Sequence, residues 1–240
     1  MFMISKKNIK LIKSLRSKKN RFIHKLFVVE GKKSIAELLK SDYDIYFLYA
    51  TSNWIRENPN SNAIEVSDVE LKRISNQNNP NEVLALVKIK RLSLLNEDGI
   101  VLVLDNINDP GNMGTIIRTC DWYGIRSIVC SINSVDIYNP KVVQAAMGSI
   151  FRVSIIYVDL FEYLKSVRTP IYGAFLYGEN VKEVSFQEKF HLVLGNEADG
   201  INKKISTLVN KKIKIKNIGN TADSLNVAVA TSILLHEMCS

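Results

Sequence analysis

Three segments in the second half of the chain combine glycine, asparagine and charged residues in spacings that suit ligand binding. The first spans residues 105–118, where a turn rich in Gly, Pro and Asn follows an apolar run and precedes a helical stretch. This pattern predicts a strand-to-helix turn with Arg118 one turn inside the helix. The alternative to a ligand-binding turn is an ordinary strand-to-helix turn capped by Asp109 or Asn112, with Arg118 as a surface ion-pair residue.

The second segment spans residues 191–201 and begins with an apolar run that ends at Leu194. Gly195 would let a ligand approach the backbone closely at the strand end, and Gly200 permits a positive φ. Glu197 lies between the two glycines and would point into the same region. The alternative is a flexible acidic turn after a strand, because short patterns of this kind are common by chance.

The third segment spans residues 213–227 and leads into the last helix of the chain. Ile215 lies near the end of an alternating strand pattern, and Ser224, Leu225 and Asn226 lie where an apolar helix begins. A helix that is apolar on nearly every face should be buried. Its first backbone N–H groups are available to a ligand, unless Asp223 or Ser224 simply caps a core helix.

Several other site classes are not supported by the sequence. There is neither a G-x-G-x-x-G dinucleotide fingerprint nor a G-x-x-x-x-G-K-[ST] phosphate loop. None of the three histidines is a good candidate base, since they lie in the basic N-terminal arm, at a strand start and after the last helix. The three cysteines are widely spaced and odd in number, so they suit neither a disulfide framework nor a zinc site. A reducing cytoplasm is the simplest setting.

The elements that position these segments are predicted from periodicity. The continuous run Ile100–Leu104 is typical of a strand buried on both faces of a parallel sheet. Strands and helices alternate after it, which predicts a doubly wound α/β domain whose ligands gather beyond the carboxyl ends of the strands. Further strands are expected at 127–130, 150–158, 171–176, 191–194 and 211–216, and helices at 115–123, from 139, at 160–167 and from about 223.

The pattern of strands and helices in the first half of the sequence predicts a smaller α/β domain of roughly 90 residues, a usual size for a domain. A polar stretch at residues 90–99 is the best linker candidate, so we expect domains at residues 1–95 and 96–240. The expected helices are 5–17, 34–40 and 67–74, with a Lys/Arg-rich turn after the first, and the expected strands are 27–30, 45–50, 64–66 and 83–89.

Charge is concentrated at the N-terminus. Residues 1–33 carry eleven Lys or Arg and one acid, a net +10, whereas the remainder carries 21 basic and 23 acidic residues, a net −2. Such a segment would attract a polyanion with salt-sensitive affinity, although a merely solvated lysine-rich helix would have the same composition. We expect Lys18, Lys19, Arg21 and Lys25 to contact nucleic acid. No apolar stretch approaches the roughly 20 residues that cross a bilayer, and no signal-peptide pattern follows the first lysines.

Taken in order, the three segments resemble the three motifs of the SpoU/TrmH RNA 2′-O-ribose methyltransferases of the SPOUT class. Three matches in the right order are far more specific than one. The resemblance covers about residues 97–240, and a shorter, less specific one links residues 21–31 to that family's ribosomal-protein-like substrate-binding domain. The matching residues are Asn106, Asp109, Pro110, Asn112, Gly114 and Arg118, then Leu194, Gly195, Glu197 and Gly200, then Ser224, Leu225, Asn226 and Val227.

The resemblance implies a C-terminal trefoil knot that holds S-adenosylmethionine, a homodimer, and structured RNA as substrate, with ribosomal RNA favoured over transfer RNA. It assigns the central catalytic role to Arg118, oriented with the ribose by Asn112, Glu197, Ser224 and Asn226. Two departures are mild: Ala198 stands where glycine is frequent, and the loop at residues 218–223 is about one residue longer than in many members. The implied cofactor-binding residues are Leu194, Gly195, Gly200, Ile215 and Leu225.

The chemical role of Arg118 stays open at this point. Methyl transfer from a sulfonium needs the ribose oxygen held in line and relieved of its proton. Arginine is protonated in almost all settings, so polarising the oxygen and positioning a phosphate are at least as plausible as a role as base. Two other classes remain alternatives: a non-catalytic RNA-binding or ribosome-assembly factor, and a nucleotide-binding oxidoreductase or open-sheet methyltransferase.

Overall fold

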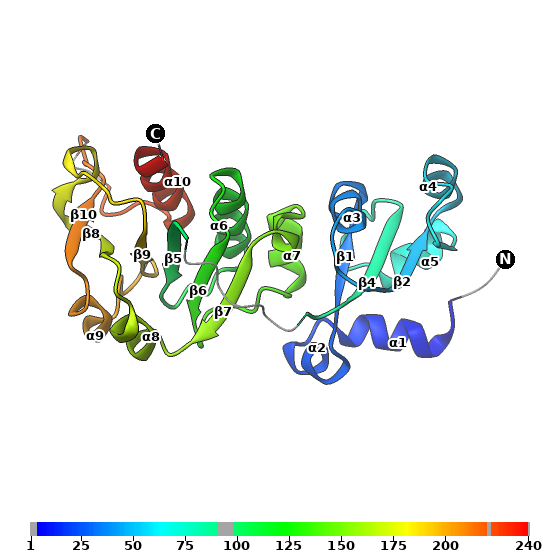
Figure 1. The fold of residues 1–240 in the computed structure, drawn as a ribbon. Coiled ribbons are helices and arrows are strands. Elements are labelled where there is room, and N and C mark those ends of the chain that lie inside the picture. Colours follow the sequence, from blue (N-terminus) through cyan, green and yellow to red (C-terminus); the bar gives the residue numbers. More distant parts are fainter. Residues whose placement is uncertain (1–3, 91–97, 220–221, 240) are drawn as a thin grey trace. The chain divides into compact units, whose positions relative to one another are not determined.

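The apolar runs of each half of the chain assemble into a sheet of their own in the computed structural model, which describes residues 4–90, 98–219 and 222–239. One compact unit contains Met1–Arg91 together with Asp136–Phe151, and the other contains Leu92–Val135 and Arg152–Ser240 (Figure 1). The boundary predicted between residues 95 and 96 falls outside the described residues and stays a prediction.

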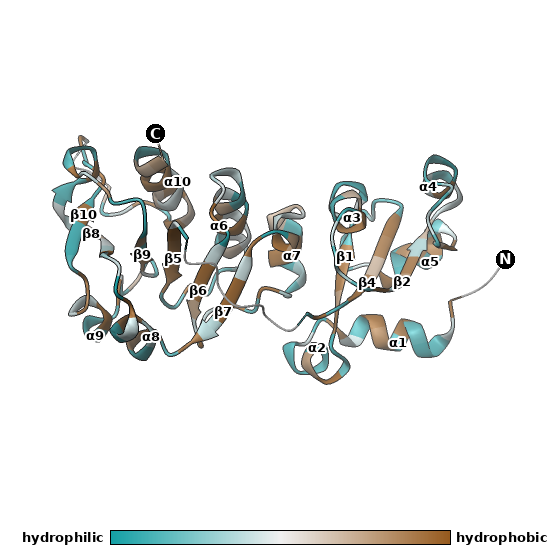
Figure 2. Cartoon of the chain, in the orientation of Figure 1, coloured by the Kyte–Doolittle hydropathy of each residue, from teal (hydrophilic) through white to brown (hydrophobic). Residues whose placement is uncertain are grey.

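The first unit is built on a four-stranded sheet with the order β1-β4-β2-β3. The strands β1 (Leu26–Glu30) and β2 (Ile45–Ala50) both pair antiparallel with β4 (Val83–Lys88), and the short β3 (Ile64–Glu65) pairs parallel with β2. All four strands lie where the sequence predicts them, within two residues. The inner strand β4 is brown in Figure 2, because five of its six residues are apolar and buried.

Two amphipathic helices cover one face of this sheet. The helix α1 (Lys6–Ser14) contributes Ile12, and α5 (Asp68–Ile74) contributes Leu71, to a core that also contains β1 and β4 residues. The start of α5 is fixed by a capping box in which Ser67 and Glu70 satisfy each other's backbone N–H groups. Three further helices belong to this half: α2 (Lys18–His24), which replaces the predicted turn, α3 (Lys32–Leu39), and α4 (Ser52–Glu57), which was not predicted.

A segment from the second half of the sequence completes the first unit. The helix α7 (Pro140–Ala146) packs on β1, and the short η1 (Ser149–Phe151), predicted as part of a strand, packs on α3. The ring of Tyr138 lies 4.6 Å from that of Phe27, centroid to centroid. Residues 136–151 therefore supply core contacts to a sheet whose strands all come from residues 26–88.

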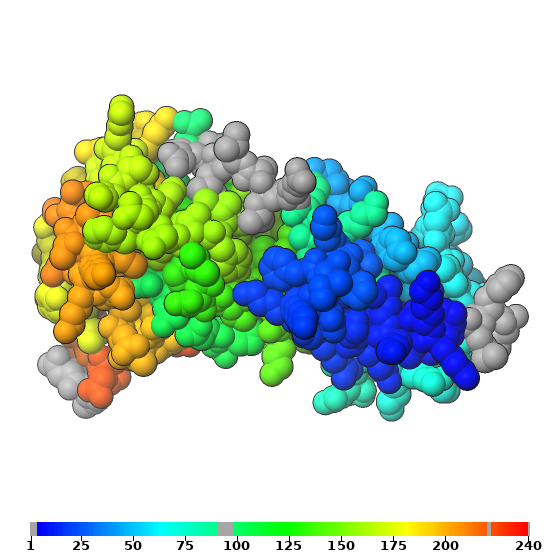
Figure 3. All heavy atoms as spheres, turned by 90° about the horizontal axis from the view of Figure 1, so that it is seen from below, coloured from blue at the N-terminus to red at the C-terminus, as the bar shows by residue number. Residues whose placement is uncertain are grey.

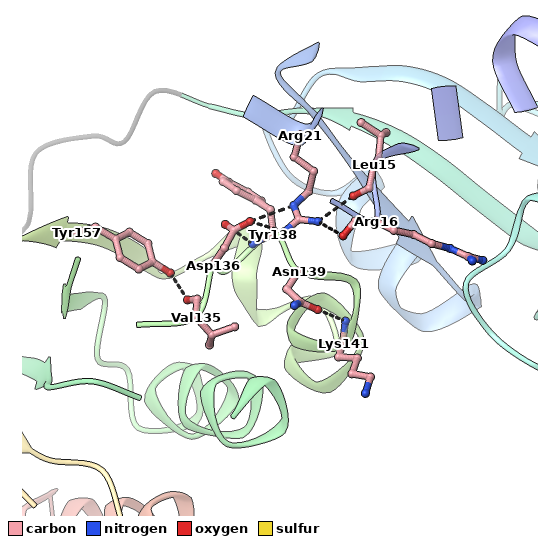
Figure 4. A network of polar contacts seen from close by, with 9 residues as sticks. All are labelled: Leu15, Arg16, Arg21, Val135, Asp136, Tyr138, Asn139, Lys141 and Tyr157. Atoms are coloured by element: carbon pink, nitrogen blue, oxygen red, sulfur yellow. Dashed lines mark hydrogen bonds and ion pairs between the residues drawn. The ribbon is translucent and has the colours of Figure 1, made fainter. Parts of the chain in front are cut away.

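A buried ion pair ties this segment to the N-terminal helices (Figure 4). Arg21 is only 2% exposed, and its Nη2 lies 2.6 Å from Oδ2 of Asp136. Its Nη1 donates to the carbonyl oxygens of Leu15 and Arg16, and the second carboxylate oxygen of Asp136 accepts from the backbone N–H of Tyr138. Each polar group of the pair is thus satisfied, as burial requires.

The expectation that Arg21 contacts RNA is therefore wrong. Its guanidinium is inside the first unit and all of its near partners are protein groups. The sequence pattern placed Arg21 in a basic turn. In the structure it lies on the inner face of α2, where its guanidinium forms a buried ion pair with Asp136. Lys18, Lys19 and Lys25 are exposed.

The second unit is a six-stranded sheet in which every strand pairing is parallel, as predicted. The strand order is β10-β8-β9-β5-β6-β7. The bounds are β5 (Ile100–Leu104), β6 (Ser127–Ser131), β7 (Ser154–Val158), β8 (Ile171–Asn180), β9 (Phe190–Leu194) and β10 (Lys211–Lys214). The strand β8 is longer and β7 and β10 are shorter than the sequence predicts.

Side chains alternate between the two faces of the sheet along each strand, so each face can pack against its own helices. Val101 and Val103 of β5 pack in one core with α8 (Leu160–Ser166) and α9 (Lys203–Ser206), of which α9 was not predicted. The helices α6 (Pro110–Trp122) and α10 (Val227–Cys239) pack against each other (Figure 1). Among the described residues, no helix is long and apolar enough to cross a membrane. The trefoil knot stays a prediction.

We expect Asp136→Ala to lower the free energy of unfolding by about 3–5 kcal/mol, because it leaves the buried Arg21 charge without its partner. Chemical denaturation of the full chain measures this loss. The double variant Arg21→Met/Asp136→Leu should recover most of it, since it removes both charges. Asp44→Ala is the matched control, because Asp44 forms an exposed pair with Lys88 and should change stability by about 0.5 kcal/mol or less. A loss of that same small size for Asp136→Ala would mean that Arg21 and Asp136 do not form a buried ion pair in solution.

Candidate functional site

The chain reverses its winding direction between β5 and β9, which are neighbours in the sheet. Such a switch point opens a crevice at the carboxyl ends of the strands. The carboxyl ends of β5 and β9 are joined there by a hydrogen bond of 2.8 Å from the Asp105 N–H to the Leu194 carbonyl. Asp105 also accepts, through Oδ2, the backbone N–H of Asn202 at 2.7 Å, and burial raises the pKa of its carboxyl. The loop after β9 is therefore anchored to the end of β5 at both its start and its finish.

A cleft of about 800 Å³ opens beside this loop, within the size range of small-molecule sites. Its wall is made by the ends of β8, β9 and β10, the loop 195–201 and the start of α10. The structure brings together here all the residues that the sequence assigned to cofactor binding: Leu194, Gly195, Gly200, Ile215 and Leu225.

The cleft wall mixes apolar side chains with charges of both signs. Acidic groups come from Glu197, Asp199 and Asp223, and basic groups from Lys203, Lys214 and Lys216. The rim also carries apolar side chains that are unusually open to solvent, with Ile218 84% and Leu225 45% exposed. This lining suits a small molecule that has a flat apolar part and carries both positive and negative groups.

Gly195 is required for a different reason from the predicted one. A Cβ on Gly195 would lie 2.0 Å from the carbonyl carbon of Gly200, so a side chain would collide with the loop's own backbone. The loop closes on itself here, because the Gly200 N–H donates to the Asn196 carbonyl. Gly200 has φ +66°, the positive value that the sequence suggested. A substitution at Gly195 would therefore disturb the loop before it reached any ligand.

Three of the predicted catalytic side chains form one hydrogen-bonded network. Nδ2 of Asn112, on α6, donates to Oε1 of Glu197 at 2.6 Å. Oδ1 of Asn112 accepts from Nδ2 of Asn226 at 2.9 Å. The network joins the three motif segments, which lie 85 and 114 residues apart along the chain.

Helix caps orient the two amides of this network. Asp109 caps α6 by accepting the backbone N–H of Asn112 at 2.8 Å, with Pro110 at the first helical position. Asn226 caps α10 by accepting the backbone N–H of Ala228 at 3.0 Å. The sequence instead named Asp223 or Ser224 as the cap of a helix starting near residue 223. Asn112 and Asn226, whose side-chain amides are hydrogen-bonded to each other, are thus each positioned at the start of a helix.

The other two predicted catalytic residues lie outside this network. Ser224 lines the cleft, and it has no hydrogen-bond partner in the part of the chain that the structure describes. Arg118 is exposed on α6, and it too lacks a hydrogen-bond or ion-pair partner within the described ranges. Because α6 begins at Pro110, Arg118 lies about two turns inside the helix rather than one. Six residues beyond Asn112 on a helix means about 9 Å further along the axis, so Arg118 does not line its own chain's cleft.

Two contributors to the cleft were missed by the sequence reasoning. Asp105 was seen only as the residue after a strand, and its burial depends on the partner loop. The far half of β8 also lines the cleft, through Phe175, Leu176 and Tyr177. Lys212 lies over two of these rings, 4.9 Å from the centroid of Phe175 and 5.0 Å from that of Tyr177. The run of large side chains Phe175-Leu176-Tyr177, which goes one residue past the predicted end of the strand, was the available signal.

Comparison with known protein families finds two matches that divide the chain. Residues 99–236 match the SpoU rRNA Methylase family, and residues 6–85 match the MRM3-like substrate binding domain. The first match spans more than half of the chain and contains the cleft, the network and Arg118. It also contains Asp136–Phe151, the segment that packs in the first unit.

Individual relatives agree with these families. The chain is 28% identical to the 23S rRNA (guanosine(2553)-2′-O)-methyltransferase RlmP of Bacillus subtilis, over 94% of this chain and 93% of that protein. A structure described as a TrmH-family RNA methyltransferase from Porphyromonas gingivalis is 36% identical, with a TM-score of 0.91 over 99% of this chain and 98% of the other. An AdoMet-bound rRNA methyltransferase from Sinorhizobium meliloti is 26% identical, with a TM-score of 0.87 over 99% and 96%.

We expect Asn112→Ala and Glu197→Ala to be energetically coupled. A double-mutant cycle on the free energy of unfolding should give a coupling of about 1 kcal/mol, the net contribution of a typical hydrogen bond. Glu197→Gln should keep most of this coupling, because the amide oxygen can still accept from Asn112. Asp199→Ala paired with Asn112→Ala is the control, since Asp199 lies in the same loop outside the network. Additive losses for Asn112 and Glu197 would mean that the contact is not formed in solution.

Proposed function

The chain belongs to the SpoU rRNA methylase family, and from this premise we propose that it transfers a methyl group from S-adenosylmethionine to a ribose 2′-hydroxyl of ribosomal RNA. The observation that carries the proposal is the Asn112–Glu197–Asn226 network at the rim of a cleft of cofactor size. The resemblance to a 23S rRNA 2′-O-methyltransferase along nearly the whole chain supports ribosomal RNA over transfer RNA.

The lining of the cleft fits S-adenosylmethionine chemically. Its adenine is flat and apolar, its amino-acid tail carries an ammonium and a carboxylate, and its sulfonium is positive. Apolar side chains of Leu194, Ile215 and Leu225 would pack against the base, and backbone groups near Gly195 and Gly200 would hold it by hydrogen bonds. Acidic and basic side chains on the same wall match the charged tail. When bound, this cofactor supplies a methyl group that is already activated for displacement.

The protein's own contribution is to hold the ribose oxygen in line and to favour loss of its proton. A guanidinium stays protonated near neutral pH, so Arg118 acts by polarising the 2′-oxygen and binding an adjacent phosphate. The network fixes the positions of Asn112 and Asn226 beside the cleft, and Ser224 supplies an exposed hydroxyl on the same wall. These side chains would orient the ribose.

A non-catalytic RNA-binding factor is the second candidate, and the intact site disfavours it. A chain that had lost activity would have no reason to keep a three-residue network across segments so distant in sequence. An exposed arginine without a protein partner at the family's catalytic position points the same way. Substrate binding falls to the first unit, where Lys18, Lys19 and Lys25 are exposed and attract the RNA backbone.

A homodimer completes the proposal. The helix α6 presents Thr115, Arg118 and Trp122 on one exposed face, spaced three and four residues apart. Trp122 is 85% exposed, and a large aromatic side chain so open to solvent is typical of an interface. Pairing of two chains through this face would carry Arg118 toward the cleft of the other copy. A cytoplasmic location fits the three free cysteines.

We expect Arg118→Ala to lower the rate of methyl transfer to ribosomal RNA by about 100-fold or more, the usual effect of removing a group that stabilises developing charge. Arg118→Lys should fail similarly, because a point charge does not replace the planar fork. Labelled S-adenosylmethionine measures the transfer, and titration calorimetry should show unchanged cofactor affinity. Arg168→Ala, a second exposed arginine of the same unit, should stay active. Loss of cofactor binding in Arg118→Ala would make the residue structural instead.

We expect Trp122→Lys to shift the protein from dimer to monomer at micromolar concentration, because it places a charge in the centre of the proposed interface. Analytical ultracentrifugation measures the change. Ile132→Lys is the matched control, since Ile132 is 62% exposed in the same unit but lies after β6. A wild-type protein that sediments as a monomer, or a variant that still dimerises, would refute an interface on this face of α6.

A further inference from the structure

Two large apolar side chains are more than half exposed within the most basic part of the chain. Phe22 is 57% exposed and Ile23 is 61% exposed, both on α2. Around them on α2 and its cap lie three lysines, Lys18, Lys19 and Lys25, which are all exposed. Their side-chain ammonium groups have no hydrogen-bond or ion-pair partner in the described part of the chain. In Figure 3 the N-terminal helices α1 and α2 form the blue part of the surface.

The spacing on α2 pairs each apolar side chain with a lysine. Phe22 follows Lys18 by four residues and Ile23 follows Lys19 by four, and positions four apart are neighbours on a helix surface. Each pair therefore sets a cation one turn from an apolar surface. A nucleotide has the complementary arrangement, with a phosphate at one end and a flat base at the other.

We propose that Phe22 and Ile23 form a platform on which an unpaired base of the substrate RNA stacks, with its flanking phosphates held by Lys18, Lys19 and Lys25. This inference rests on the proposed function, because it assigns a feature of the RNA that the enzyme binds. Single-stranded loops and bulges offer bases that aromatic side chains can stack on, whereas bases within an A-form duplex are out of reach. The platform selects RNA with an unpaired nucleotide at this contact.

Other occupants fit this surface poorly. A stable protein interface buries about 800 Å² on each partner, far more than two side chains supply, and the ring of lysines would repel a basic partner. A membrane-surface helix buries a broad apolar face in the bilayer, whereas α2 exposes only two large apolar side chains, Phe22 and Ile23. RNA alone matches both the positive charge and the small apolar area.

The platform is also held rigidly from below. Arg21, between Lys19 and Phe22 along α2, points inward to Asp136 and to the carbonyl oxygens of Leu15 and Arg16. A platform fixed before binding avoids the entropy cost of ordering it on contact. The backbone of Lys25 also supports a binding role. Lys25 ends α2 in the left-handed region with φ +51°, a position that glycine or asparagine usually fills, so a lysine there is better explained by its charge than by its conformation.

The test uses the full-length protein and two synthetic RNAs of equal length, a hairpin with an unpaired loop and a perfectly paired duplex. Wild-type protein should prefer the hairpin. Phe22→Ala should weaken hairpin binding about tenfold to a hundredfold, the loss expected for one stacked base, and should leave duplex binding unchanged. Phe22→Trp should retain the preference. Phe22→Leu should lose it, because Ile23 adds only apolar contact and the stacking itself needs the aromatic face at position 22. The salt dependence of binding should stay the same in Phe22→Ala.

Lys25→Gly separates binding from folding. It should reduce the slope of log affinity against log salt by about one, as expected for one phosphate contact. Its melting temperature should stay unchanged or rise by a few degrees, because glycine accepts the left-handed conformation without strain. A fall in melting temperature with RNA affinity intact would instead make Lys25 structural.

Val69→Ala is the matched control, since Val69 is 79% exposed in the same unit but lies on α5 between two acidic residues. It should bind both RNAs as the wild type does. Equal hairpin affinity for wild type and Phe22→Ala would overturn the platform while leaving the methyltransferase proposal standing. A wild-type protein that binds neither RNA would remove the proposed substrate itself. Loss of dimerisation or of vesicle binding in Phe22→Ala, with hairpin affinity intact, would assign the patch to another partner.

Discussion

The pairing of β5 with β9 is the constraint on which the second unit depends. It sets the switch point of the parallel sheet, and the hydrogen bond from Asp105 to Leu194 extends the pairing one residue beyond β5. The loop that follows β9 must then turn back at once, which is why Gly195 has no room for a side chain. Glu197 is projected by this turn toward Asn112 at the start of α6. A single strand pairing thus determines both the shape of the cleft wall and the position of its carboxylate.

The first unit depends in a comparable way on the pair of Arg21 and Asp136. A buried ion pair contributes little net stability compared with apolar packing, so its value lies in specifying one arrangement. The fork of Arg21 needs acceptors from Leu15, Arg16 and Asp136 simultaneously, and only one placement of α2 provides them. The exposed lysines on the outer side of α2 are therefore held in a fixed pattern.

The sequence predicted the sheet strands and the motif segments well, because both depend on local pattern. Ile100–Leu104 is continuously apolar and its limits agree with β5, and the residues around Gly195 line the cleft as expected. It failed where a long-range partner decides the role of a residue. Arg21 is chemically the same as an RNA-binding arginine, and only Asp136, 115 residues away, reveals that it is buried. Asp105 was missed for the same reason, because Asn202, 97 residues away, determines its role.

The segment Asp136–Phe151 shows that the family matches and the compact units divide this chain differently. It belongs by sequence to the methylase match, yet Tyr138 packs on Phe27 and α7 packs on β1. A fragment that began near residue 96 would lose β1 and α3, and it would expose Tyr138 together with the unpaired carboxylate of Asp136. Such a fragment would have to reorganise this segment before it could be compared with the full chain. The effect of the basic N-terminus on RNA binding is therefore better separated by surface substitutions on α2 than by deletion, since these leave the buried contacts of the segment intact.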